Sequence, residues 1–266
     1  MNVHPLLIAA QRVVLQRHSR FRLVAVGAAV LAGICLLPLN GAWFHRDDFW
    51  LLSLARYTTN PLYFWTYDHS AFYFFRPVAM TLWWCSVALW GSEPTAHYAL
   101  NALLHGAVAL SFGLWMRAFA RSSTVGGLAI VFYAVHPVAV RTTMWLSDRF
   151  DLLASGSVFA ACALFLHPSD SKLRRAELCL LTLSACLSKE TGFVLLALVA
   201  LHFMFRRHAD SGAAAYFLKL DLPLIGACAG AAIVVRGRCC AAVACRFWTR
   251  QSRIRCSKAR CCTRER

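Results

Sequence analysis

Two adjacent aspartates, Asp47 and Asp48, follow directly on the first long apolar run of the chain, in the stretch WFHRDDFW at residues 43–50. Carboxylates transfer protons and bind divalent cations, so an acidic pair is suited to both kinds of chemistry. The flanking Trp and Phe are typical of the headgroup level of a bilayer. The pair is therefore a candidate reaction centre at the outer end of a membrane span. The alternative is a solvated loop, because runs of charge usually face water.

Further polar side chains are expected on the same side of the membrane as this pair. They are Arg76, His97, Asn101, Arg149, Asp151, Lys189 and Glu190. Arginine and lysine neutralise phosphate groups, and carboxylates activate an acceptor or hold a metal. Acids, arginines and a lysine that converge on one face are what a reaction on a phosphate-linked donor would need.

Three of the polar residues share one helical stripe. His97, Asn101 and His105 recur every four residues, and this spacing places them on the same side of a helix. Two interpretations stay open. The stripe faces a cavity near the site, or it forms hydrogen bonds to neighbouring helices within a bundle.

The composition places most of the chain in lipid. Hydrophobic residues make up 59% of the chain and charged residues 15%, whereas soluble domains carry about 25% charged residues. In a bilayer the backbone must satisfy its own hydrogen bonds, so an all-α bundle of transmembrane helices is expected. The net charge of +16 is concentrated in residues 236–266. Without this segment the balance is ordinary for basic cytoplasmic loops, and no nucleic-acid partner is expected.

Seven membrane spans are predicted from the apolar runs. They lie at 21–39, 97–116, 124–140, 151–167, 176–188, 191–205 and 213–235. If the segment 72–91 does not cross, the basic clusters downstream fall on the side of the N-terminus, as the positive-inside rule requires. We therefore expect an interfacial or re-entrant helix there. Within the span at 124–140, His136 and Pro137 favour a kink or a helix end.

This topology predicts a multi-pass protein, with a basic cytoplasmic N-terminus at 1–20 and one transmembrane domain at 21–235. The expected location is a bacterial inner (plasma) membrane, with the active face outward. The tail at 236–266 is rich in Arg and Cys and has no apolar periodicity, which is typical of a frameshift that truncates a longer protein. Its cysteine spacing does not fit a zinc site.

Taken in order, several short motifs resemble those of a known enzyme group. They are RDDFW (46–50), FRPV (75–78), LWG (89–91), HxxxNxxxH (97–105), FYAVHP (132–137), MWLSxRxDLLA (144–154) and LSKET (187–191). The series is similar to the bacterial and animal tetratricopeptide-linked O-mannosyltransferases. These belong to the C-class (GT-C) glycosyltransferases, which use polyprenyl- or dolichyl-phosphate sugars. The resemblance covers roughly residues 40–205.

The resemblance implies that Asp47 and Asp48 form the catalytic element. One of them would act as general base on the acceptor or help to position a divalent metal. The contacts to the lipid phosphate would come from Arg76, Arg149 and Lys189. Their ionic partners, or contacts to the acceptor, would be Asp151 and Glu190.

The implied activity is transfer of a hexose such as mannose from a polyprenyl-phosphate donor to a protein or glycan acceptor. Two departures from the group matter. The match stops before residue 236, and no tetratricopeptide period of about 34 residues is visible. The alternatives are a transporter or flippase for a lipid-linked or anionic substrate, and a non-catalytic membrane remnant.

Overall fold

The computed structural model describes residue 27 and residues 42–66, 74–167, 171–206 and 222–234. Every regular element in these ranges is a helix, which confirms the expected all-α fold. The predicted N-terminal segment, nearly all of the first span and the Arg/Cys-rich tail lie outside the described residues, as does the beginning of the last span.

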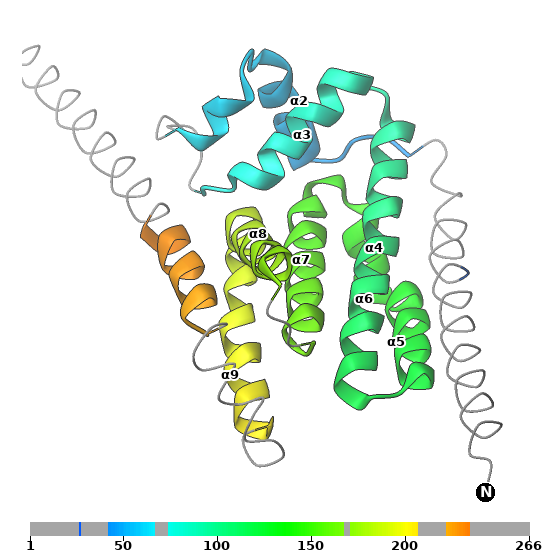
Figure 1. Ribbon diagram of the computed structural model, residues 1–266. Coiled ribbons are helices and arrows are strands. Elements are labelled where there is room, and N and C mark those ends of the chain that lie inside the picture. The colour runs from blue at the N-terminus through cyan, green and yellow to red at the C-terminus, as the bar shows by residue number, and fades with distance from the viewer. Residues whose placement is uncertain (1–26, 28–41, 67–73, 168–170, 207–221, 235–266) are drawn as a thin grey trace, which may run out of the picture.

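The described helices follow one another along the chain (Figure 1). In order they are α2 (Asp47–Tyr57), η2 (Pro61–Trp65), α3 (Pro77–Trp90), α4 (Pro94–Ala120), α5 (Ser123–Val135), α6 (Pro137–Met144), η3 (Leu146–Asp148), α7 (Arg149–Phe165), α8 (Lys172–Ser188), η4 (Glu190–Phe193), α9 (Val194–Arg206) and a last helix at Leu222–Val234. Proline opens η2, α3, α4 and α6, where its missing N–H has no intrahelical partner to lose.

The helices form a bundle with a layer across one end. The bundle consists of α4 to α9, and α2 and α3 lie across its upper end in Figure 1. Helix α4 packs along α5 and α7, and α7 packs along α8. Helices α4 and α5 approach closely, because a Cβ atom on Gly113 would lie 2.8 Å from the backbone oxygen of Gly126. Small residues permit such close packing between helices in membranes.

The predicted span at 124–140 is interrupted. Helix α5 ends at Val135, and α6 begins at Pro137 with its axis turned by 52°. Pro137 cannot donate a backbone hydrogen bond, which ends the first helix and fixes the bend. The kink expected at His136 and Pro137 is therefore present.

Within the described residues, α4 is long and apolar enough to cross a membrane. The bent pair of α5 and α6 passes the same test when the two helices are taken together. The helices at Pro77–Trp90, Glu190–His202 and Leu222–Val234 are apolar but shorter. The predicted span at 97–116 lies inside α4, and the seven-span bundle remains a prediction.

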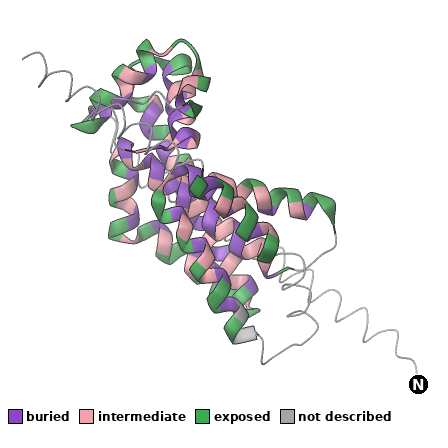
Figure 2. Cartoon of the chain, turned by 90° about the vertical axis from the view of Figure 1, so that its left-hand side faces the viewer, coloured by how far each residue is buried: buried purple, intermediate pink, exposed green. Residues whose placement is uncertain are grey.

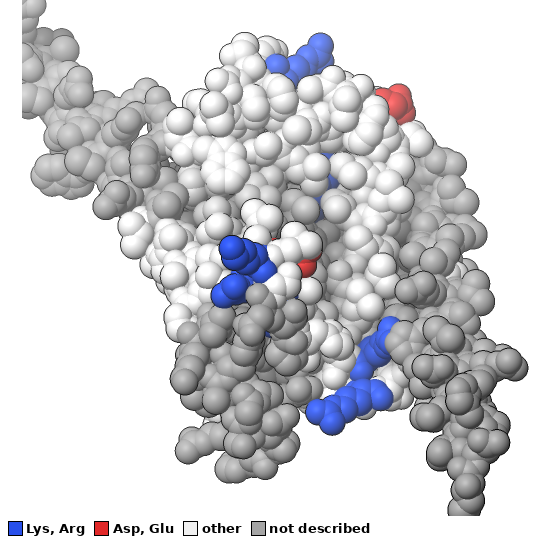
Figure 3. Space-filling model, viewed as in Figure 1, with Lys and Arg blue, Asp and Glu red and all other residues white. Residues whose placement is uncertain are grey.

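Buried residues line the contacts between helices, and exposed residues lie on the outside (Figure 2). Apolar residues are nevertheless common on the outer surface: Leu128, Val131, Phe132 and Val135 form an exposed stripe along α5. Figure 3 shows that most of the described surface on one side of the molecule carries no charge. Exposed apolar patches of this kind mark surfaces that contact lipid or another protein.

Candidate functional site

The residues singled out from the sequence separate into two groups in space. The first, which we call the buried cluster, consists of Asp48, Ser86, His97, Asn101, Ser147 and Arg149. The second, which we call the ion-pair quartet, consists of Arg76, Asp151, Lys189 and Glu190. Asp47 belongs to neither group and is exposed to solvent.

Asp48 is buried, and both of its carboxylate oxygens accept hydrogen bonds from protein groups. Its side chain is 0% exposed, and one carboxylate oxygen accepts hydrogen bonds from the backbone N–H (2.7 Å) and the hydroxyl of Ser147. The other oxygen accepts a hydrogen bond from the backbone N–H of His45 at 3.0 Å, while the Asp48 N–H donates to the His45 carbonyl. Asp48 therefore fastens the start of α2 to η3.

Asp47 occupies the first position of α2 and points out of this network. The backbone just before it is unusual, because Arg46 has a positive φ of 41°. Such a conformation is costly for a residue with a side chain, and strained residues gather at functional sites. The two neighbouring acids thus differ: Asp48 is fixed inside the protein, and Asp47 is the carboxylate that a substrate can reach.

Arg149 also lies inside the protein. It is 0% exposed, and its guanidinium donates to Asn101 Oδ1 (2.7 Å), Ser86 Oγ (3.0 Å) and the His97 carbonyl (3.2 Å). The group also stacks on the Trp83 ring, with Cζ at 4.5 Å from the ring centroid. Since its donors face protein acceptors, its position supports a role in joining α3, α4 and α7 rather than a contact to substrate.

The polar stripe of α4 satisfies carbonyl groups at the ends of other helices. His97 Nε2 donates to the carbonyl of Gly91, which ends α3. Asn101 Nδ2 donates to Thr143 O in the last turn of α6, and His105 Nε2 to Ala134 O in the last turn of α5. The last carbonyls of a helix have no intrahelical partner, so these contacts replace water as a donor. Of the two interpretations, hydrogen bonding between helices describes the stripe.

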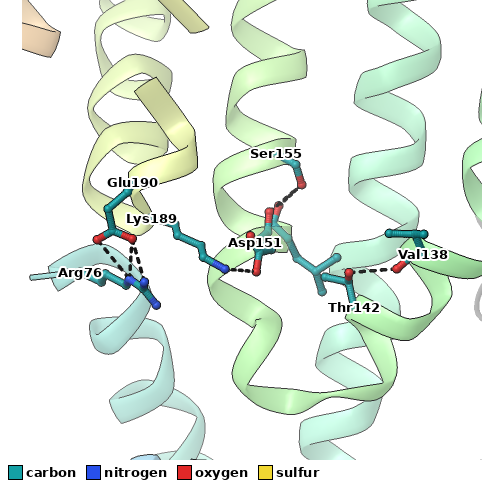
Figure 4. Close-up of polar contacts among 8 residues, drawn as sticks. Arg76, Val138, Thr142, Asp151, Ser155, Lys189 and Glu190 are labelled. Carbon is teal, nitrogen blue, oxygen red and sulfur yellow. Dashed lines mark hydrogen bonds and ion pairs between the residues drawn. The ribbon is translucent and has the colours of Figure 1, made fainter. Parts of the chain in front are cut away.

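The ion-pair quartet lies at the junction of α8 and η4 with α3 and α7 (Figure 4). Arg76 donates through Nη2 to Glu190 Oε2 at 2.7 Å and through Nε at 3.2 Å. The Lys189 ammonium pairs with Asp151 Oδ2. All four side chains keep contact with solvent, with exposed fractions between 17% for Arg76 and 50% for Glu190. The structure thus brings together Arg76 and Glu190, which lie 114 positions apart in the sequence, and Asp151 and Lys189, which lie 38 apart.

Aromatic rings link the quartet to the helix that carries Asp47. Trp50 in α2 contacts Phe74 edge-on, with ring centroids 6.4 Å apart. The guanidinium of Arg76 lies 4.3 Å from the centroid of Phe74 and 5.2 Å from that of Phe150. The start of α2 and the quartet therefore occupy the same end of the molecule.

Asp148 is a further acid at this end. Burial raises the pKa of its carboxyl above the ordinary value, and the negative charges of Asp151 and Asp48 act in the same direction. Lys189 and Arg141 oppose the increase in pKa. Asp148 is therefore the carboxyl here whose surroundings favour the protonated form.

An apolar groove begins beside the quartet. A cavity of about 460 Å³ lies between α4, α5, α6, α7, η4 and α9. Asp151, Thr142 and Thr191 line it near the quartet, and Phe112, Phe159 and Leu198 line it further along the bundle. Asp151 and Phe159 are two turns apart on α7, which corresponds to about 12 Å. The groove can hold a slender apolar chain with a polar head at the quartet.

Sequence reasoning overlooked several members of this region. Ser86 and Asp148 had no assigned role, although the run at 147–151 (SDRFD) places three charges within four residues. The groove could not be recognised, because its walls come from six separate elements. In the described ranges, no three His, Cys, Asp or Glu side chains gather in a way that could hold a metal ion.

Comparison with known proteins gave no match to a protein-family model, a curated protein or a solved structure.

Proposed function

We propose that the chain is a multi-pass membrane glycosyltransferase of the GT-C type. It transfers a sugar from a polyprenyl-phosphate donor to a protein or glycan acceptor at the outer face of the membrane, and a bacterial inner membrane is the proposed location. The observation that carries the proposal is the shared end of the molecule, where an exposed Asp47 faces solvent and the ion-pair quartet borders an apolar groove.

The surface of the protein supports a lipid environment. Only 33% of the most apolar window of α4 is buried inside the protein, whereas the core helix of a soluble protein is mostly buried. Helix α5 exposes a continuous apolar stripe as well. Helix α3 has 14 residues, and at 1.5 Å per residue it measures about 21 Å, short of the roughly 30 Å hydrocarbon core. An interfacial position for α3 fits its place across the end of the bundle (Figure 1).

In the proposed reaction, Asp47 takes the proton of the acceptor hydroxyl. The acceptor oxygen forms a bond to the anomeric carbon of the sugar, and the bond between that carbon and the phosphate oxygen breaks. The polyprenyl phosphate leaves with the electron pair. Arg76 and Lys189 are suited to contact the phosphate, and the groove to receive the isoprenoid chain. Asp48 and Arg149 position the start of α2 and the end of α3.

The test uses the full chain in lipid nanodiscs with polyprenyl-phosphate mannose or glucose as donor and a detergent extract of bacterial membranes as the source of protein and glycan acceptors. Release of free polyprenyl phosphate is measured, because it reports transfer to any acceptor. Asp47→Asn should lower this release by at least about 100-fold, as expected for the loss of a general base, without changing the melting temperature.

The matched control is Glu177→Gln, which neutralises an exposed carboxylate in the half of α8 that is distant from Lys189. Its release rate should equal that of the parent chain. Undiminished release by Asp47→Asn would remove the assigned base, and no release by the parent with any donor would remove the transferase proposal.

A second candidate function, transport of a lipid-linked or anionic substrate, is favoured by one observation. The bend of 52° between α5 and α6 is a broken helix of the kind that transporters use near their substrates. The charges of the quartet lie instead at helix ends, which favours the transferase. A flipping assay in reconstituted vesicles distinguishes the two, because a transporter would move a lipid-linked sugar that it does not cleave.

A further inference from the structure

The ion-pair quartet carries no net charge as it stands. Its two cations are each matched by one carboxylate, Arg76 by Glu190 and Lys189 by Asp151. The pairs are partly open to solvent, so an incoming anion can compete with either carboxylate. Any phosphate that binds here therefore meets cations whose charge is already largely compensated.

The proposed transfer reaction changes the charge of the lipid phosphate. The donor is a phosphodiester with one negative charge. When the sugar leaves, the lipid keeps the bridging oxygen with its electron pair and becomes a monoester, whose charge at pH 7 is about −1.5 to −2, as for other phosphate monoesters. The acceptor proton moves to the carboxylate base, so the balance of charge and atoms is complete. A site with two uncompensated cations would hold this product more tightly than the donor.

Of the two carboxylates, Asp151 is placed to act on the lipid phosphate. It lines the groove and also pairs with Lys189. A second acid, Asp148, lies close enough to interact electrostatically with both Asp151 and Lys189. Glu190 is 50% exposed and is held by two nitrogen atoms of Arg76. The negative charge nearest to the mouth of the groove is therefore that of Asp151.

We propose that Asp151 is a specificity-determining residue that selects a singly charged lipid phosphodiester over a doubly charged lipid phosphate monoester. This inference rests on the proposed function and adds to it a reason for product release. The Asp151 carboxylate competes with the phosphate for Lys189. It also repels a doubly charged phosphate more strongly than a singly charged one. The donor binds, and the product leaves.

Equilibrium binding of two probes tests this selection without any turnover. The probes are farnesyl phosphate, a monoester, and its methyl ester, a diester with the same chain, and binding to the full chain in nanodiscs is followed by tryptophan fluorescence. In Asp151→Asn, the monoester should bind about tenfold more tightly and the diester about threefold, because the removed repulsion scales with the ligand charge. Equal factors for both probes, or no change, would overturn the proposal.

A change of pH supplies an internal control. The second pKa of a phosphate monoester is about 6, so at pH 5 farnesyl phosphate carries mostly one charge. The two probes should then respond equally to Asp151→Asn. A difference between the probes that persists at pH 5 would show that shape rather than charge is selected and would overturn the proposal. Glu177→Gln should leave both affinities unchanged at both pH values.

The transfer reaction supplies a second measurement, which distinguishes failure of the proposed function from failure of the proposed selectivity. In Asp151→Asn, the inhibition constant of polyprenyl phosphate should fall about tenfold and the KM of the donor about threefold, by the same charge scaling. If the probes behave as expected and no transfer is found with the parent chain, the function is wrong and the anion selectivity stands. If transfer occurs and the probe ratio does not change, the selectivity is wrong and the function stands.

Discussion

The buried cluster and the ion-pair quartet use the same types of residue for different purposes. Arg149 is 0% exposed and donates to three acceptors that belong to three different residues of the protein. Arg76 is 17% exposed and shares its donors with one carboxylate that is half in solvent. An arginine in such a bundle is therefore a candidate for ligand binding only where a ligand can displace its partner.

Position within the helices explains the division. The members of the buried cluster fix the ends of helices, where backbone groups have no partner within their own helix. The quartet lies where α7 and α8 reach the rim of the bundle, and its carboxylates can exchange for a ligand. Four sets of substitutions test this division between the buried cluster and the ion-pair quartet.

Arg149→Met should be the most damaging. It leaves the buried acceptors of Asn101 and Ser86 without their donor. Each unsatisfied buried group costs about 1–3 kcal/mol, so the loss is about 2–6 kcal/mol, which lowers the melting temperature by about 4–24 °C for a domain of this size. Thermal unfolding in detergent measures this shift. Arg56→Met, which removes an exposed arginine, should be nearly neutral, and similar melting temperatures for both variants would contradict the division.

Asp48→Asn should destabilise the protein more than the same substitution at its neighbour Asp47. The amide nitrogen of Asn cannot accept a hydrogen bond, and it would face the donors of either Ser147 or His45. A buried donor then loses its acceptor, which lowers the free energy of unfolding by about 1–3 kcal/mol. Asp47→Asn alters an exposed carboxylate and should change the free energy of unfolding by less than about 0.5 kcal/mol. The same thermal measurement applies, and the reverse order of the two variants would show that their roles have been exchanged.

The ion pair between Arg76 and Glu190 should contribute little. A double-mutant cycle with Arg76→Met and Glu190→Gln should give a coupling energy of about 0–1 kcal/mol, as is usual for pairs that reach solvent. The coupling should shrink in about 1 M salt, where the screening length is only about 3 Å. A coupling energy as large as the loss in Arg149→Met would place this pair in the same class as the buried cluster.

Asp148 should make stability depend weakly on pH. Its pKa in the folded protein is raised, so the folded state favours the protonated carboxyl, and the parent loses stability as the pH rises through that pKa. Asp148→Asn lacks this loss. It should match the parent well below pH 4, where the carboxyl is protonated in both the folded and the unfolded state, and melt at a higher temperature at neutral pH. A constant difference across the pH range would show that Asp148 does not titrate as its surroundings require.

Much of the helical framework could be predicted from the sequence. Pro137 marked the break between α5 and α6, and the spacing of His97, Asn101 and His105 marked one face of α4. In both cases a short stretch of chain holds the information, because proline and helical periodicity act locally. The resemblance offered Asp151 and Glu190 either as ionic partners of the cations or as acceptor contacts, and it did not assign each carboxylate to a cation.

The distinction between Asp47 and Asp48 could not be predicted. It depends on Ser147, which is 99 residues away in the sequence. Likewise, the burial of Arg149 depends on Ser86, at a separation of 63 residues. Such contacts are set by how the helices pack. The sequence gives the type of each residue, but it does not show whether the partner of that residue is a protein group or a ligand.

The capping of three helix ends by α4 bears on how the chain is assembled during synthesis. The carbonyl of Gly91 precedes α4 by a few residues, whereas those of Ala134 and Thr143 emerge from the ribosome after α4 is complete. When α5 and α6 form, the donors for their last turns are already present on α4. Helix α4 thus precedes the helices whose ends it caps, and loss of the His105 imidazole would remove the donor to Ala134 before α5 can dock.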